Sequence, residues 1–292
     1  MPTFDTPQPI FVALDLGVAD VRIVASERAN TTVEVRPRDG AKKSDVAAAE
    51  QTRVEYNGGR LSIEAPKGWR RYSFRGGRES VDVEIALPTG SHVRGEAGIA
   101  SFRCTGRLGE CHFKTGLGEL RVDEAGAVEV DTGAGDISVE RAFDGAEITT
   151  GSGAVHVGSI VGAGVIKNSN GDTWVGDVTG NLRVNAANGK ISVGQAHATV
   201  AAKTANGDVR LGQVERGAIL AQTACGKIDV GIRDGVAAWL ELSTSYGNVH
   251  NHLGPAERPG PTEDAVEVRA RSSFGDIAVR RSPSSGSTGV EP

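Results

Sequence analysis

The chain has 292 residues, a formal net charge of −5 with both signs mixed, and only 4% aromatic residues. The mixed charge argues against a general nucleic-acid surface, and no apolar run approaches the 18 residues of a transmembrane helix. Its 40 glycines are about twice the average share, which is typical of a protein rich in corners.

Two further features concern the compartment. Three cysteines in a chain of this length do not make a disulfide framework. Residues 1–8 carry neither the basic nor the apolar region of a signal peptide. We therefore expect a cytoplasmic protein.

Residues 1–93 predict a β-rich module. Ile10–Leu16 and Val21–Val24 are strand-like, and residues 16–23 match a phrase that recurs later in the chain, so we interpret them as a detached first copy. Ser44–Gln51 predicts a short helix with Ser44 as its N-cap.

A hairpin is predicted next, because Asn57-Gly58-Gly59 lies between two alternating segments. We expect residues 1–93 as a whole to cap the open end of the repeats that follow, since an uncapped sheet edge invites pairing with other chains.

The stretch 67–78 combines five cations with three aromatic side chains, whereas the whole chain has only 13 aromatic residues. Arginine with aromatic residues is the composition of binding hot spots, of nucleic-acid loops and of membrane-surface anchors. The alternative is a loop folded over the solenoid, with its rings inward and its arginine stems on apolar surface. The residues expected to contact a partner are Lys67, Trp69, Arg70, Arg71, Tyr72, Phe74, Arg75 and Arg78.

From residue 115 a phrase of the form Thr-Gly-x-Gly-Asp-Ile-x-Val recurs. Its anchor glycines are Gly118, Gly135, Gly153, Gly171, Gly189, Gly207 and Gly226, separated by 17, 18, 18, 18, 18 and 19 residues. Apolar-polar-apolar triplets on both sides of each glycine indicate short strands with one buried face. Each repeat is too small to bury that face alone, so the copies must stack. The sequence predicts an all-β fold, a β-solenoid of about 18-residue coils with the N-terminal module as its cap.

Stacked coils place equivalent side chains above one another, about 4.8 Å apart. We expect an amide ladder and a hydroxyl ladder with structural roles. The ladder residues are Asn170, Asn188 and Asn206, and Thr115, Thr132, Thr150, Thr204 and Thr223.

The domain boundaries follow from this spacing. We expect the cap at 1–93, the solenoid repeats at 94–253, an inserted loop rich in proline and glycine at 254–264, a last coil at 265–281 and a disordered tail at 282–292.

Candidate chemistry is sparse. Acidic residues follow several anchor glycines, as in calcium-binding nonapeptide repeats, but Ala154, Lys190 and Lys227 interrupt that column and its spacing differs. The sequence leaves open whether the column binds an ion. Cys104 and Cys111 are expected to be small buried residues, and a lone pair of histidines near residue 250 is a weak metal signal. We expect no cofactor, metal or catalytic residues. The acidic positions are Glu119, Asp136, Asp172, Asp208 and Asp276.

The recurring phrases, with Asn-Ser-Asn-Gly-Asp at Asn168, resemble the bacterial β-strand-repeat family labelled "putative adhesin", in its actinobacterial form. The resemblance covers about Ile10 to Arg280. It implies a β-solenoid of unknown function without catalytic residues, and the adhesin label implies export, for which residues 1–8 carry no signal.

We therefore expect a non-enzymatic structural or interaction protein. Its β-solenoid would present flat faces and the 67–78 loop to a protein partner or cell-envelope component, and not to nucleic acid. One alternative is self-association into a filament, similar to bactofilins. The other is a carbohydrate-binding or carbohydrate-cleaving surface, which needs exposed aromatic residues such as Trp174.

For the loop, we predict that Arg70→Ala, Arg71→Ala and Arg75→Ala together leave folding intact and abolish binding of a partner or of anionic lipid. Pulldown and lipid sedimentation measure the binding, and thermal unfolding measures the stability. A loss of several kcal/mol in the free energy of unfolding would instead identify the loop as a structural lid.

Overall fold

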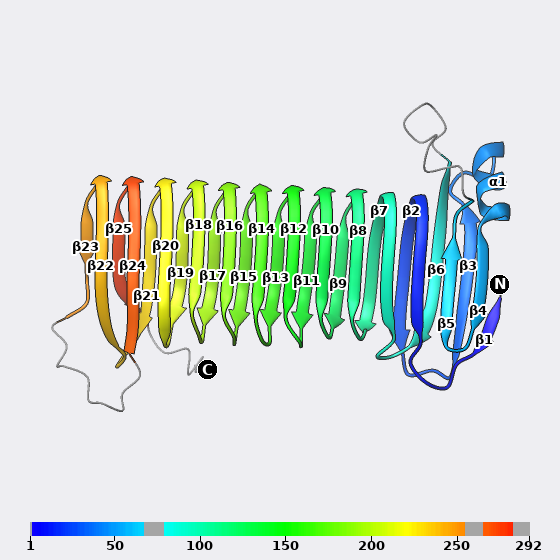
Figure 1. Cartoon of the computed structure of the whole chain (residues 1–292), viewed down its shortest axis with the longest axis horizontal. Coiled ribbons are helices and arrows are strands. Elements are labelled where there is room, and N and C mark those ends of the chain that lie inside the picture. Colours follow the sequence, from blue (N-terminus) through cyan, green and yellow to red (C-terminus); the bar gives the residue numbers. More distant parts are fainter. Residues whose placement is uncertain (1, 67–78, 255–264, 283–292) are drawn as a thin grey trace, which may run out of the picture. The chain divides into compact units, whose positions relative to one another are not determined.

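The computed structural model describes residues 2–66, 79–254 and 265–282. The chain divides into two compact units, which are described separately. Unit 1 comprises residues 1–161 and 166–170, and unit 2 comprises residues 162–165 and 171–292. Both units consist of β-strands in solenoid coils, which confirms the predicted fold class (Figure 1).

The strands and the helix of unit 1 come first along the chain. They are β1 (Thr3–Asp5), β2 (Phe11–Ser26), β3 (Asn30–Pro37), α1 (Lys43–Gln51), β4 (Arg53–Asn57), β5 (Arg60–Glu64), β6 (Ser80–Pro88), β7 (His92–Arg107), β8 (Cys111–Leu117), β9 (Leu120–Ala125), β10 (Val128–Ala134), β11 (Ile137–Ala142), β12 (Ala146–Ser152), β13 (Val155–Ile160) and most of β14 (Gly164–Asn170). Unit 2 contains β15 (Thr173–Val178), β16 (Leu182–Asn188), β17 (Ile191–Ala196), β18 (Val200–Asn206), β19 (Val209–Val214), β20 (Gly217–Cys225), β21 (Ile228–Arg233), β22 (Ala237–Tyr246), β23 (Val249–Asn251), β24 (Ala265–Phe274) and β25 (Ile277–Ser282).

In unit 1 each coil gives one strand to each of two parallel sheets. β8, β10 and β12 pair in one sheet, with Val128 opposite Cys111 on one side and Ala146 on the other. β9, β11 and β13 pair in the second sheet. Paired residues are one coil apart in the sequence, so the predicted coil of about 18 residues is confirmed.

Unit 2 repeats this arrangement. β16, β18 and β20 form one parallel sheet, and β15, β17, β19 and β21 form the other. Alternate residues of both sheets point inward: Ile191, Val193, Val200 and Ala202 are at most 3% exposed. Thin aliphatic layers therefore fill the core, because the period-two alternation buries one face of each strand.

β2 and β7 form two successive coils of unit 1, because β7 pairs along its length with both β8 and β9 of the next coil. They pair in parallel over nearly their whole length, from Phe11 opposite His92 to Val24 opposite Thr105. This confirms the interpretation of residues 16–23 as a detached copy of the repeat. The largest buried rings of the unit, Phe102 and Phe113, pack with 4.9 Å between their centres.

Beyond β2, the parallel stacking of unit 1 changes to antiparallel pairing. β6 pairs with β2 in parallel and with β3 in antiparallel fashion, and β4 forms the predicted antiparallel hairpin with β5. The hairpin loop has positive φ at Gly58 and Gly59, 56° and 82°, as a two-residue turn of this kind requires.

The helix α1 packs against β3 and β6 (Figure 1). The prediction that Ser44 is its N-cap is wrong: the cap position is Lys42, without a side-chain cap bond. The buried carboxylate of Asp45 lies 2.8 Å from Lys42 Nζ and accepts the backbone N–H of Ser80 at 3.3 Å. The first turn is thus held by a carboxylate that also anchors the start of β6.

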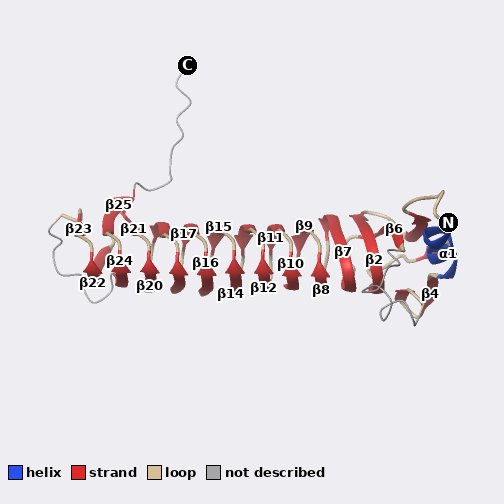
Figure 2. Ribbon diagram, turned by 90° about the horizontal axis from the view of Figure 1, so that it is seen from above, coloured by secondary structure: helices blue, strands red, loops and turns tan. Residues whose placement is uncertain are grey.

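The last coils of unit 2 stack in an order that differs from their order in the sequence. β24 pairs with β20 on one side and with β22 on the other, and β25 likewise lies between β21 and β23. Figures 1 and 2 show β24 between β20 and β22. The coil expected at 265–281 is therefore last in the sequence, whereas the coil of β22 and β23, hereafter the terminal coil, is last in the stack.

The corner at each anchor position requires glycine for two reasons. Gly207 has a φ of 145°, which side chains rarely adopt. A Cβ at that position would also lie 2.0 Å from the carbonyl oxygen of Gly189 in the preceding coil. Comparable clashes, at 1.9–2.2 Å from a backbone oxygen, would arise at Gly118, Gly135, Gly153, Gly189, Gly226 and Gly275.

We predict that Gly207→Ala lowers the free energy of unfolding by about 3 kcal/mol or more, because neither the φ angle nor the stacking distance can relax cheaply. Chemical denaturation measures the change. Gly40→Ala is the matched control, since a Cβ there meets nothing within 4 Å, and it should change stability by no more than about 0.5 kcal/mol. Equal effects of both substitutions would contradict the stacking argument.

Candidate functional site

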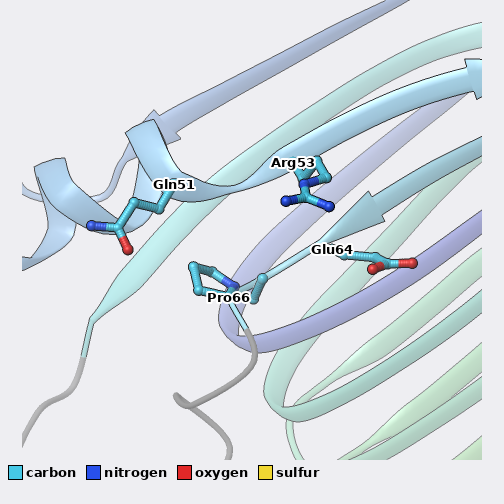
Figure 3. A pocket seen from close by; sticks show the side chains of 5 residues that line it. Gln51, Arg53, Glu64 and Pro66 are labelled. Atoms are coloured by element: carbon cyan, nitrogen blue, oxygen red, sulfur yellow. The ribbon is translucent and has the colours of Figure 1, made fainter.

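The loop expected to contact a partner, from Lys67 to Arg78, lies outside the described residues. A pocket of about 470 Å³ is lined by Gln51, Arg53, Glu64, Ala65 and Pro66 (Figure 3). Because Pro66 directly precedes residues that the structure does not describe, we assign no ligand to this pocket.

A second pocket, of about 280 Å³, lies on the outer surface of β2, β7, β8 and β10 in unit 1. Its polar groups already bind one another: His112 Nδ1 lies 2.9 Å from Glu129 Oε2, and His92 Nδ1 accepts the backbone N–H of Glu110 at 3.0 Å. These contacts link neighbouring coils, so the pocket alone identifies no ligand.

The acidic column has a structural use. In unit 1, Asp136 accepts the backbone N–H of Ala154 at 2.8 Å. In unit 2 the partners are Lys190 for Asp172, Lys227 for Asp208 and Asn248 for Asp276, at 2.7–2.9 Å. Each aspartate therefore binds the coil stacked after its own, at a position that carries another residue type. Alanine, lysine or asparagine at these positions avoids a second stacked carboxylate, which would repel the first. Glu119 and Asp136, in contrast, occupy equivalent positions of successive coils. The hydrogen bond from Asn248 lowers the pKa of Asp276 below its ordinary value.

The expected ladder residues face the same corners. The threonines are buried, and Thr223 Oγ1 donates to the carbonyl of Gly207 in the preceding coil at 2.9 Å, whereas Thr115 Oγ1 donates to Leu117 of its own coil at 3.0 Å. Asn206 Nδ2 donates to Asn188 Oδ1 at 2.9 Å, which is the contact of an amide ladder. These hydroxyl groups thus bond to the corner carbonyls rather than to each other.

Cys104 and Cys111 are buried, and burial raises the pKa of Cys111 to about 12, so its thiol stays protonated. No group of three or more His, Cys, Asp or Glu side chains in the described part of the chain is placed to hold a metal ion. His250 and His252 have parallel rings with 6.1 Å between their centres. Among the described residues, no helix is long and apolar enough to cross a membrane.

A charged cluster, which the sequence analysis did not find, links four successive coils of unit 2. His197 Nε2 lies 2.8 Å from Asp177 Oδ1, and its Nδ1 lies 2.7 Å from Glu215 Oε2. Arg233 binds the other oxygen of Glu215 at 3.1 Å, and Arg216 donates to the carbonyl of His197 at 2.8 Å. Both ring nitrogens are therefore engaged within the stack.

This cluster shifts the titration of its members. Partial burial opposes the charged ring, but the hydrogen bonds and charges of Glu215 and Asp177 outweigh that effect and raise the pKa of His197. The hydrogen bond from His197, more than the opposing burial, lowers the pKa of Glu215. The protonated ring thus stabilises the folded state.

The terminal coil is the most exposed apolar part of unit 2. Trp239 is 63% exposed and Tyr246 is 69% exposed. Tyr246 stacks on Phe274 of the adjacent coil, with 4.8 Å between ring centres and 6° between ring planes. By comparison Trp174, the aromatic residue noted in the sequence, is 39% exposed. Exposed, pre-stacked rings are typical of interaction surfaces.

The same coil has an open strand edge. Of the described residues, only those of β24 pair with β22, and only those of β25 pair with β23. The edge of β22 therefore offers backbone N–H and C=O groups to a further strand. The sequence does not predict this open edge, because the repeat phrase at Thr244 resembles the phrases of the internal coils.

These features define a class of protein: a parallel β-solenoid whose charged side chains join neighbouring coils and whose terminal coil in unit 2 has an edge that no further described strand covers. The family model described as Toastrack DUF4097 matches residues 11–283. The chain belongs to the Toastrack DUF4097 family, and the resemblance to the β-strand-repeat "putative adhesin" proteins is confirmed.

Solved structures show the same kind of likeness at low identity. A "putative adhesin" from Parabacteroides merdae is 14% identical over 95% of this chain and 94% of its own, with a TM-score of 0.35. One from Parabacteroides distasonis is 14% identical over 95% of each chain, with a TM-score of 0.32. A "putative cell adhesion protein" from Clostridium sporogenes is 12% identical over 96% of this chain and 98% of its own, with a TM-score of 0.22. No curated protein matches the chain. At these values the structural likeness carries no argument about function.

For the His197 cluster we predict a pH-dependent stabilisation. Since the folded pKa of His197 is raised, its contribution is fully present below the ordinary value of about 6.5 and is lost as the pH rises through the folded pKa. His197→Gln should lower the free energy of unfolding at pH 5 by roughly 1 kcal/mol at most, and by less at pH 9. Denaturant titrations at both pH values measure this, and an identical loss at pH 5 and pH 9 would refute it.

Proposed function

We propose that this protein is a non-enzymatic interaction scaffold that binds its partner through the terminal coil of unit 2. The single observation that carries the proposal is the combination, in one coil, of an open parallel-strand edge with exposed aromatic rings. Backbone groups on such an edge provide affinity by strand addition, and neighbouring side chains provide selectivity.

The arrangement of charge supports this proposal. In the terminal coil, residues 237–251 contain one carboxylate, Glu241, and no lysine or arginine. Glu241 is bound to Arg271 at 2.6 Å and to Arg269 at 3.4 Å. Edge strands usually carry lysine, proline or a bulge that prevents pairing. β22 has none of these features, which favours the proposal that a partner strand covers it.

The other expectations stay predictions. A cytoplasmic location, a cell-envelope partner and carbohydrate recognition are each compatible with this fold, which by itself does not specify function. Filament formation stays an expectation that the oligomeric state of the chain tests. Unlike these expectations, the proposed binding surface consists of named residues of the terminal coil, so substitutions can test it directly.

We predict that Trp239→Ala together with Tyr246→Ala weakens partner binding at least tenfold, because exposed aromatic anchors carry much of the binding free energy at interfaces. Both side chains are more than 60% exposed, so the free energy of unfolding should change by no more than about 0.5 kcal/mol. Quantitative pulldown from a lysate of the source organism, followed by titration of the captured protein, measures the effect.

Trp174→Ala is the matched control, because Trp174 is an exposed tryptophan of β15, in the same unit but outside the terminal coil. Unchanged capture by the double variant, or equal losses in the control, would show that the terminal coil is not the binding surface.

A further inference from the structure

The terminal coil ends the core of unit 2 with an incompletely covered layer. Leu240 and Leu242 of β22 point inward but remain partly exposed, whereas their partners in β24, Val268 and Ala270, are fully buried. Val249 of β23 is 45% exposed, although the equivalent Ile277 is fully buried. One more stacked coil would bury this layer, because each coil of the unit covers the one before it.

The surface is also complementary to itself. Its inward residues are aliphatic. Histidines apart, the only charged side chain of residues 237–251 is Glu241, and it is neutralised by Arg269 and Arg271. Two such surfaces can approach without electrostatic repulsion. A lysine- or glutamate-rich edge would prevent this approach.

We propose that the partner of the terminal coil is the terminal coil of a second copy of this chain, with β22 antiparallel to β22 of the second copy. The inference rests on the proposed function and names its partner. A two-fold axis through the contact would extend both sheets, cover Leu240 and Leu242 of both copies and leave no open β22 edge. Such an interface uses the same patch on both copies and closes after two.

The same geometry argues against a filament. An open polymer needs a heterologous contact between two different complementary surfaces. In unit 1 the parallel stacking gives way to antiparallel strands and α1, which cannot continue the parallel ladder of the terminal coil. We therefore expect association to stop at the dimer.

The alternation of β22 restricts the register. In an antiparallel pair, directly opposed residues lie on the same face. A register centred on Glu241 would oppose two carboxylates, which is destabilising. A register centred on Leu242 places Leu242 opposite its own equivalent and Glu241 opposite Ser243, with aliphatic residues inward. We assign the Leu242-centred register.

The test is the mass of the full chain by sedimentation equilibrium between about 1 and 100 μM. We expect about twice the 30.3 kDa of one chain at the upper concentrations. Leu240→Lys with Leu242→Lys should lower the mass to that of one chain, because the lysines introduced at position 242 would oppose each other directly across the axis and those at position 240 would add charge to the same interface. Ser192→Lys, on the internal strand β17, is the control for a lysine placed outside the interface and should leave the dimer unchanged.

A second measurement keeps the result interpretable if the lysine variant unfolds. A spin label on Leu242→Cys, in a chain whose exposed Cys225 is replaced by serine, should report a label pair across the axis at the shortest distance that the label allows. A label on Ser192→Cys should give a longer distance. A wild-type chain that stays monomeric, a mass that grows beyond two copies, or a long distance at position 242 would overturn the dimer.

Failure of the dimer and failure of the proposed function can be told apart. If the wild-type chain is monomeric but captures another protein through Trp239 and Tyr246, the interaction scaffold stands and the second copy is excluded. If it is monomeric and the aromatic substitutions change no capture, both proposals fail.

Discussion

The structure depends on how closely one coil can lie on the next at the corners. At Gly207 an added Cβ would come within 2.0 Å of the carbonyl oxygen of Gly189, so each corner must be glycine. The glycines allow the coils to stack at the strand spacing of about 4.8 Å, and they recur once in each coil of about 18 residues. Core packing, ladder hydrogen bonds and side-chain columns all follow from this stacking, because each requires equivalent residues of successive coils to lie above one another.

Several polar side chains of the coils serve this stacking. Asp208 binds the backbone of the next coil, and His197 joins the carboxylates of two others. Lateral faces of this kind are largely satisfied by their own contacts, and a charged residue on them is weak evidence of a binding site. The terminal coil differs, because stacking leaves both its backbone edge and its apolar layer without a further coil among the described residues.

The open coil arises from the order of stacking. After β21 the chain forms β22 and β23 first and then returns, so that β24 and β25 lie against β20 and β21. The coil that lies last in the stack contains Trp239, Leu240 and Tyr246 and a single carboxylate. A coil that is buried on one side and nearly uncharged on the other fits a role in binding better than a role as a cap, which would carry charge or a covering helix.

The sequence by itself determined the solenoid, its period and its glycine corners, because these repeat at short, fixed spacings that local backbone geometry dictates. It also determined the detached first copy and the hairpin at Gly58. Only the tertiary structure decided which coil lies outermost: the phrases at Thr244 and Ser272 are nearly alike, so either could stack on β20, and long-range pairing makes the choice. The sequence did not predict the hydrogen-bond partners of Asp208 and His197 for the same reason. They lie about one coil away in the sequence, and only stacking brings them within hydrogen-bonding distance.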